Sequence, residues 1–167
     1  LRIGVAPGSV IRPLSNAVSP YRLVVIGSSI THGSGVSNPG MAYPARMQRE
    51  LGIEVVNLGA SGQCKLEPFF ARIAADTEAD MFLFDCFSNP SAEQIDERLE
   101  AFVDIVRSAH PDTPLVFLQT LRRETANFNR RISGFENAKQ DAARRNMAKV
   151  IKKYDGSRNK IYSSGNR

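Results

Sequence analysis

The chain has 167 residues, of which 42% are hydrophobic and 23% are charged, and its formal net charge is +5. This length fits one domain with a buried core that needs no disulfide or metal for its stability. No window approaches the roughly 18 consecutive apolar residues of a membrane span, so we expect no membrane insertion. Much of the positive charge lies in residues 144–154. There the basic residues alternate with an apolar stripe at helical spacing, which indicates a solvated helix face and argues against nucleic-acid binding.

The first 20 residues contain prolines and begin with LRIGV, which alternates like a strand without a partner. We interpret residues 1–20 as a tail or linker from a preceding β-rich region. From residue 21 onward, short apolar runs alternate with amphipathic stretches. The runs predict strands over residues 23–27, 54–58, 81–86, 114–119 and 160–163, and the stretches predict helices near residues 41–51, 67–77, 92–108 and 136–154. This order is typical of an α/β fold with helices on both faces of a parallel sheet.

Three loops follow the first three predicted strands: GSSITHGSG (27–35), NLGASGQC (57–64) and DCFSNPS (85–91). In open parallel sheets the carboxyl ends of the strands meet at one edge, where ligands bind. The glycines of the first loop fit neither GxGxxG nor a P-loop, which argues against nucleotide binding. A serine at a strand-to-helix turn instead exposes its hydroxyl and its own N–H, as acyl transfer requires. Ser29 has this position, although its surroundings do not match the GxSxG elbow.

The motifs themselves resemble those of the SGNH hydrolases, the GDSL-like lipases and acylhydrolases. GSSITHG with GMAY at residues 40–43 resembles the first block of the branch that reads GTSIT and GMAY, often preceded by a β-rich domain. NLGASG and DCFSN resemble the second and third blocks. The resemblance implies a three-layer α/β/α, flavodoxin-like sheet of about five strands in the order 2-1-3-4-5. It also implies that Ser29 is the nucleophile and that Gly62 and Asn89 are further oxyanion donors.

Several of these residues also have a purely structural interpretation. Gly62 is suited to close approach of its N–H because it has no Cβ, but a glycine can also simply form the turn. Asn89 precedes Pro90, so its side chain could instead cap the next helix or form a turn. His32 lies too close to Ser29 in sequence to act as its base, and we assign it to loop packing or to the rim of the substrate site. His110 lies before the fourth strand, at the opposite end of the sheet.

Other side chains have supporting roles or allow more than one interpretation. Asn57 and Ser61 are positioned to brace the second loop through local hydrogen bonds. Arg122, with Arg123, Arg130 and Arg131, lies where an anionic part of the substrate would pass, although solvated surface charge also explains such a cluster. Cys64 and Cys86 lack CxxC spacing, and we interpret them as small buried apolar residues. With only two histidines as well, the sequence implies no metal and no organic cofactor.

The resemblance ends before the C-terminus, since SGNH hydrolases carry their base in a DxxH motif and this sequence has none. We therefore expect residues 21–167 to form an SGNH hydrolase domain that stops before its DxxH block. The function indicated is a serine esterase that cleaves small O-acyl esters, with a small-molecule or carbohydrate ester as its partner. A non-catalytic binding domain or inactive fragment on the same fold, and an acyltransferase, are the alternatives. Nothing in the sequence separates a cytoplasmic from a secreted protein.

Overall fold

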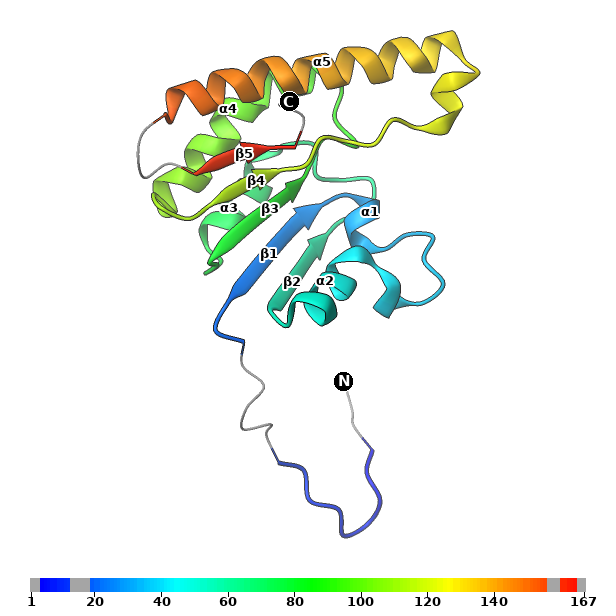
Figure 1. Cartoon of the computed structure of the whole chain (residues 1–167), viewed down its shortest axis with the longest axis vertical. Helices are drawn as coiled ribbons and strands as arrows, with labels where there is room; N and C mark the ends of the chain where they lie inside the picture. The colour runs from blue at the N-terminus through cyan, green and yellow to red at the C-terminus, as the bar shows by residue number, and fades with distance from the viewer. Residues whose placement is uncertain (1–3, 13–18, 156–159, 165–167) are drawn as a thin grey trace.

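The structure is a computed structural model that describes residues 4–12, 19–155 and 160–164. Its centre is a five-stranded sheet in the order β2-β1-β3-β4-β5, in which every neighbouring pair is parallel (Figure 1). The strands are β1 (Arg22–Gly27), β2 (Glu54–Gly59), β3 (Met81–Asp85), β4 (Leu115–Phe117) and β5 (Ile161–Ser163). The predicted strands, their parallel arrangement and the order 2-1-3-4-5 are confirmed.

Helices connect the strands, as parallel pairing requires. They are α1 (Ser29–His32), α2 (Tyr43–Leu51), α3 (Pro68–Ala75), α4 (Ala92–Ala109) and α5 (Arg130–Lys153), with short 3-10 turns η1 (Pro39–Met41) and η2 (Glu124–Asn127). Local capping interactions mark several of their ends. The α4 helix, for example, starts with a reciprocal capping box between Ser91 and Gln94, and α2 ends at Gly52, whose φ of 64° is left-handed.

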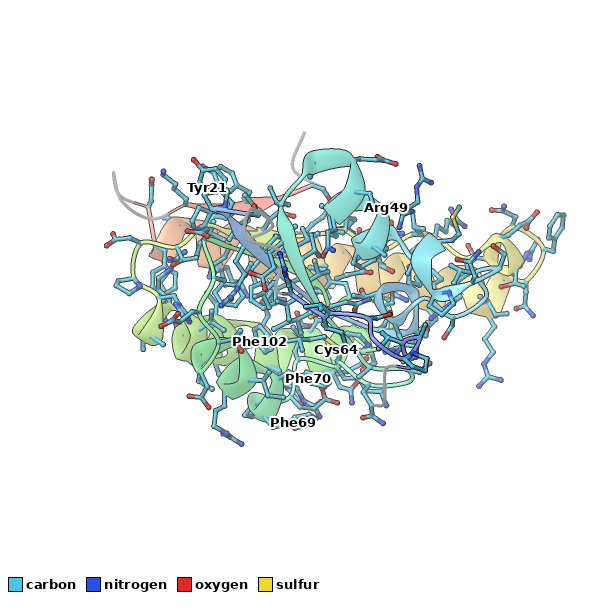
Figure 2. All side chains as sticks on the ribbon, turned by 90° about the horizontal axis from the view of Figure 1, so that it is seen from below. Tyr21, Arg49, Cys64, Phe69, Phe70 and Phe102 are labelled. Atoms are coloured by element: carbon cyan, nitrogen blue, oxygen red, sulfur yellow. The ribbon has the colours of Figure 1, made fainter. Side chains whose placement is uncertain are left out.

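The two faces of the sheet are covered differently. Apolar residues of α3, α4 and α5 pack on one face and form the main core together with alternate residues of the strands. A smaller cluster centred on Leu23, Val25 and Leu83 packs on the other face against α2 residues such as Met47. Figure 2 shows Phe70, Phe102 and Cys64 on the first side and Arg49 of α2 on the second. The core is rich in stacked aromatic rings, among them Phe82, Phe84 and Phe117.

One feature differs from expectation. The last long helix begins at Arg130, six residues before the predicted start at residue 136. The Asn129 side chain caps it by accepting hydrogen bonds from the N–H groups of Arg131 and Ile132. This cap stabilises the start of the helix, where Ser133 and Gly134 have low helix propensity. Residues 4–12 form no helix or strand, and the remainder of LRIGV lies outside the described residues. None of the helices in the described ranges combines the length and apolarity needed to cross a bilayer.

The end of β1 has no space for a side chain, which gives a first prediction. A Cβ on Gly27 would collide with Thr31 Oγ1 and lie 2.9 Å from Asp85 Cβ. We expect Gly27→Ala to lower the free energy of unfolding by about 1–3 kcal/mol, measured by urea denaturation. Gly134→Ala is the matched control, because a Cβ there meets nothing within 4 Å and alanine favours the helix by about 0.5–1 kcal/mol. Equal stability of the two variants would contradict the prediction.

Candidate active site

The three loops start at one level of the sheet. In the parallel register, Gly27 at the end of β1 lies opposite Gly59 of β2 and also opposite Asp85 of β3. The strands therefore release their loops side by side at the carboxyl edge. Backbone contacts join them further, since the Ala60 N–H donates to the Gly27 carbonyl at 2.9 Å.

The first loop turns at once into the short helix α1. Ser28 is buried and caps this helix, accepting a hydrogen bond from the Ile30 N–H at 3.4 Å. Ser29 is therefore the first helical residue, where an N–H has no partner within the helix. Among the described residues, no group forms a hydrogen bond with the Ser29 hydroxyl or its N–H. The helix ends at Gly33, whose φ of 100° is left-handed. Both donors of Ser29 are thus unengaged within the described structure.

Asp85, a buried carboxylate at the end of β3, forms hydrogen bonds with side chains of α1 and α2. The Thr31 hydroxyl donates to Asp85 Oδ2 at 3.0 Å, and the Tyr43 hydroxyl reaches the same oxygen at 3.4 Å. Burial raises the pKa of Asp85, and the two hydrogen bonds only partly oppose that shift. Burial also raises the pKa of Tyr43, so its hydroxyl remains protonated and able to donate at neutral pH. The network holds α1 against the end of β3.

The second loop is braced as expected by Asn57. Its Oδ1 accepts the Gly59 N–H at 2.9 Å, and its Nδ2 donates to the Thr31 carbonyl at 2.8 Å. The Ser61 hydroxyl lies 3.3 Å from the Ser34 hydroxyl of the first loop. Gly62 has a φ of 73°, and a Cβ there would meet nothing within 4 Å. The left-handed backbone, and not lack of space, therefore explains a glycine at this position.

The third loop is fastened to the second through Asn89. Its Nδ2 donates to the Gln63 carbonyl at 2.6 Å. The next helix is capped by Ser91, so capping by Asn89 is not its role. An amide nitrogen carries two N–H bonds. One is engaged by Gln63, next to Gly62, and this bond fixes the direction of the other.

A buried ion pair on α5 contacts the same loop at the Ser88 carbonyl. Glu136 and Lys139 are both 0% exposed, and their Oε2 and Nζ atoms lie 3.0 Å apart. Lys139 Nζ donates to the Ser88 carbonyl at 3.2 Å, and Arg123 Nη2 donates to the same carbonyl at 3.0 Å. Arg123 Nη1 also donates to Glu136 Oε1 at 2.5 Å. Burial lowers the pKa of Lys139, although the carboxylate of Glu136 opposes this effect.

The remaining candidates lie at the margins. His32 is exposed, and its Nδ1 lies 3.1 Å from the Gly59 carbonyl. Arg122 is exposed and donates to the Ser133 hydroxyl at the start of α5. His110 follows α4, and its Nε2 lies 3.0 Å from the Ala74 carbonyl. Within the described ranges, no three His, Cys, Asp or Glu side chains gather as a metal site would need.

Sequence reasoning missed the supporting residues Asp85, Glu136 and Lys139. A signal for the pair on α5 exists, since residues 136, 139, 143, 147 and 150 follow one helical stripe. The two charged residues thus lie on the buried face, where an ion pair was the simplest interpretation. Asp85 gave a weaker signal as an acidic residue at the end of an otherwise apolar strand.

A depression of about 280 Å³ opens beside Ile30, the residue that follows Ser29 in α1. It is lined by Ile30, Tyr43, Asp85, Leu118, Gln119 and Leu121. Half of these side chains, those of Ile30, Leu118 and Leu121, are aliphatic. The Gln119 amide has no hydrogen-bond partner for its Oε1 or Nε2 in the part of the chain that the structure describes. The depression can therefore take a small apolar group, whereas the two amide atoms of Gln119 are themselves buried.

A comparison with protein families decides the affiliation: residues 21–165 match the GDSL-like lipase/acylhydrolase family. The chain belongs to this family. A protein from Bacteroides ovatus, described as a GDSL-like lipase, is 40% identical, with a TM-score of 0.80 over 87% of this chain and 43% of its own. This chain thus spans less than half of that relative. A comparison with curated proteins gives no match.

More distant structures share the fold. A family two carbohydrate esterase from Cellvibrio japonicus has a TM-score of 0.65 at 13% identity, over 92% of this chain and 53% of its own. The salicylyl-acyltransferase SsfX3 from a tetracycline biosynthetic pathway has a TM-score of 0.66 at 19% identity, over 96% and 46%. At these identities the likeness concerns the α/β architecture alone.

The buried ion pair gives a second prediction. Lys139→Met removes the charge that faces Glu136 inside the core, and breaking such a pair typically costs about 3–5 kcal/mol of unfolding free energy. Urea denaturation would measure this loss. Lys149→Met, on the exposed side of the same helix, is the matched control and should change stability by less than about 0.5 kcal/mol. A Lys139→Met protein as stable as the control would show that the pair does not support the fold.

The pH dependence of stability tests the environment of Asp85. Because its folded-state pKa is raised, the folded protein binds this proton more tightly than the unfolded chain. Stability from this group is therefore present at low pH and is lost as the pH rises from about 4 through the folded pKa. Asp85→Asn removes the ionisation, so its stability relative to the wild type should improve between about pH 3.5 and pH 7. Parallel stability curves for the two proteins would refute this expectation.

Proposed function

We propose that this chain is the acyl-transfer unit of a serine esterase that cleaves small O-acyl esters, with a carbohydrate or similar alcohol as the leaving group. The observation that carries the proposal is the register that aligns Gly27, Gly59 and Asp85, because it opens the loops with Ser29, Gly62 and Asn89 side by side. We also assign the chain to the GTSIT and GMAY branch of its family, on the residues GSSIT and GMAY.

In the proposed reaction the Ser29 Oγ attacks the ester carbonyl. The carbonyl oxygen becomes an oxyanion, stabilised by the N–H groups of Ser29 and Gly62 and by the second N–H of the Asn89 amide. These donors are held before the reaction, so little reorganisation opposes the charge. Collapse of the intermediate expels the alcohol and leaves an acyl group on Ser29. Water then attacks this acyl-enzyme, releasing the acid and restoring the serine.

The hydroxyl also needs a base. His32 contacts Gly59 and His110 contacts Ala74. Within the described residues, no hydrogen bond joins either histidine to Ser29. We therefore propose that the base is a histidine, paired with an aspartate, that lies outside these 167 residues. His32 and Arg122 remain proposed contacts at the substrate rim.

The depression at Ile30, the residue after Ser29, supports the choice of a small acyl group. Its volume of about 280 Å³ fits a short chain better than a lipid tail, and Leu118 and Leu121 supply apolar contacts. An alcohol in place of water would make the same unit an acyltransferase, and a panel of alcohol acceptors would separate the two reactions.

The proposal is tested on the purified full-length protein, which would supply the proposed base, by labelling with a serine-reactive fluorophosphonate followed by peptide mapping. We expect one adduct on Ser29, none in Ser29→Ala, and normal labelling in the neighbouring control Ser34→Ala. Asn89→Ala should lower the turnover of a short-chain aryl ester by about 100- to 1000-fold, because one oxyanion donor is lost. Ester hydrolysis that persists in Ser29→Ala would overturn the assignment of the nucleophile.

A non-catalytic binding domain is the second candidate, and it is favoured by the absence of a suitably placed histidine. It predicts no adduct on Ser29 but measurable binding of an ester or sugar. Calorimetric titration with acetylated sugars, compared between the wild type and Asn89→Ala, would detect such binding.

A further inference from the structure

The two cysteines meet inside the core. Cys64 Sγ and Cys86 Sγ lie 2.7 Å apart, and both residues are 0% exposed. Cys64 lies in the loop after β2 and Cys86 follows the last residue of β3. Figure 2 shows Cys64 in the interior, on the side of the sheet where Phe70 and Phe102 pack. A disulfide bond is about 2.05 Å long, so a small shift of the two side chains would bring the sulfur atoms to bonding distance.

The backbone gives an independent reason to look for a role of Cys64. Its φ is 58°, a left-handed conformation that glycine adopts freely and that costs other residues about 1 kcal/mol or more. Cysteine does not favour this conformation, and yet it occupies the position with its side chain turned into the core. Backbone strain of this kind persists where surrounding interactions over-determine it. The contact with Cys86 is such an interaction.

We propose that Cys64 and Cys86 form a disulfide that covalently joins the loop after β2 to the loop after β3. Cys64 directly follows Gln63, whose carbonyl accepts the hydrogen bond from Asn89. Cys86 lies on the same loop as Asn89. The bond would therefore hold together the two loops that carry Gly62 and Asn89. This consequence for catalysis rests on the proposed function, whereas the bond itself does not.

Formation of the bond is a two-electron oxidation by a small disulfide such as oxidised glutathione. The thiolate of one cysteine attacks the small disulfide, forms a mixed disulfide and expels one thiolate. The second cysteine then attacks the mixed disulfide and expels the other. The two protons of the cysteine thiols end on the two released thiols, and the small disulfide is reduced.

The bond is structural and not a switch. Neither residue is exposed to solvent, so oxidants and reductants do not reach the sulfur atoms in the folded protein. Burial also raises the pKa of the Cys86 thiol, which disfavours the attacking thiolate once the core has closed. We therefore expect the bond to form while the chain folds and to resist reductants afterwards.

Mass spectrometry tests the bond directly. The full chain is unfolded, refolded in a buffer of reduced and oxidised glutathione, and then denatured in excess N-ethylmaleimide. We expect no maleimide adduct, a mass two hydrogens below that of the reduced chain, and one cross-linked peptide pair that contains residues 64 and 86. Two adducts per chain, glutathione adducts, or disulfide-linked dimers would each overturn the proposal.

Stability measurements separate the bond from simple packing of two thiols. Reduction of the denatured wild type before refolding should lower its melting temperature by roughly 6–12 °C. The same treatment should not change the melting temperature of the Cys64→Ala/Cys86→Ala protein. Cys64→Gly suits the left-handed backbone and removes only the side chain, so it should resemble the reduced wild type. A Cys64→Gly protein as stable as the oxidised wild type would show that the sulfur contributes nothing.

The two proposals fail separately. Maleimide-reactive cysteines with a normal fluorophosphonate adduct on Ser29 would overturn the disulfide and leave the esterase. An intact disulfide without any adduct would do the reverse.

Discussion

The parallel register at the carboxyl ends of β1, β2 and β3 is the constraint on which the candidate site depends. Gly27, Gly59 and Asp85 share one level, so three loops leave the sheet together although they are far apart in sequence. The first two of these residues are glycines for a steric reason. A Cβ on Gly59 would collide with the backbone of His32, and one on Gly27 would collide with the side chain of Thr31. The close packing of α1 on the sheet therefore requires a glycine at the end of each of the two strands β1 and β2.

A second layer of interactions then holds the loops in place. The Ser88 carbonyl accepts hydrogen bonds from both Arg123 and Lys139. Two cations at one carbonyl polarise the peptide that joins Ser88 to Asn89 and hold it in one orientation. Glu136 balances this charge within the core. A buried ion pair is by itself weak evidence for stability. Here it holds the Ser88 carbonyl, and so it orients the peptide bond that leads into Asn89.

The sequence predicts the elements that depend on local patterns. Strand positions, the sheet order and the grouping of three loops at one edge follow from apolar runs and from the resemblance to a family. The predicted start of α5 was wrong because the cap at Asn129 outweighs the weak helix propensity of Ser133 and Gly134. The Glu136 and Lys139 pair was missed because a hydropathy stripe counts only apolar residues, although both lie on it. The meeting of Cys64 with Cys86 is a tertiary contact between residues 22 positions apart, and no local pattern encodes it.

The second loop shows why its own residues are insufficient to define the site. Gly62, Cys64 and Leu66 have φ values of 73°, 58° and 60°, so left-handed residues alternate along this loop. Only the glycine adopts this conformation without a cost. The conformation is therefore maintained from outside, by Asn89 on the Gln63 carbonyl, by Arg98 of α4 on the Lys65 carbonyl at 3.1 Å, and by burial of Leu66. The position of the Gly62 N–H is thus set by the third loop and by α4, and a substitution in either can displace a donor that it never touches.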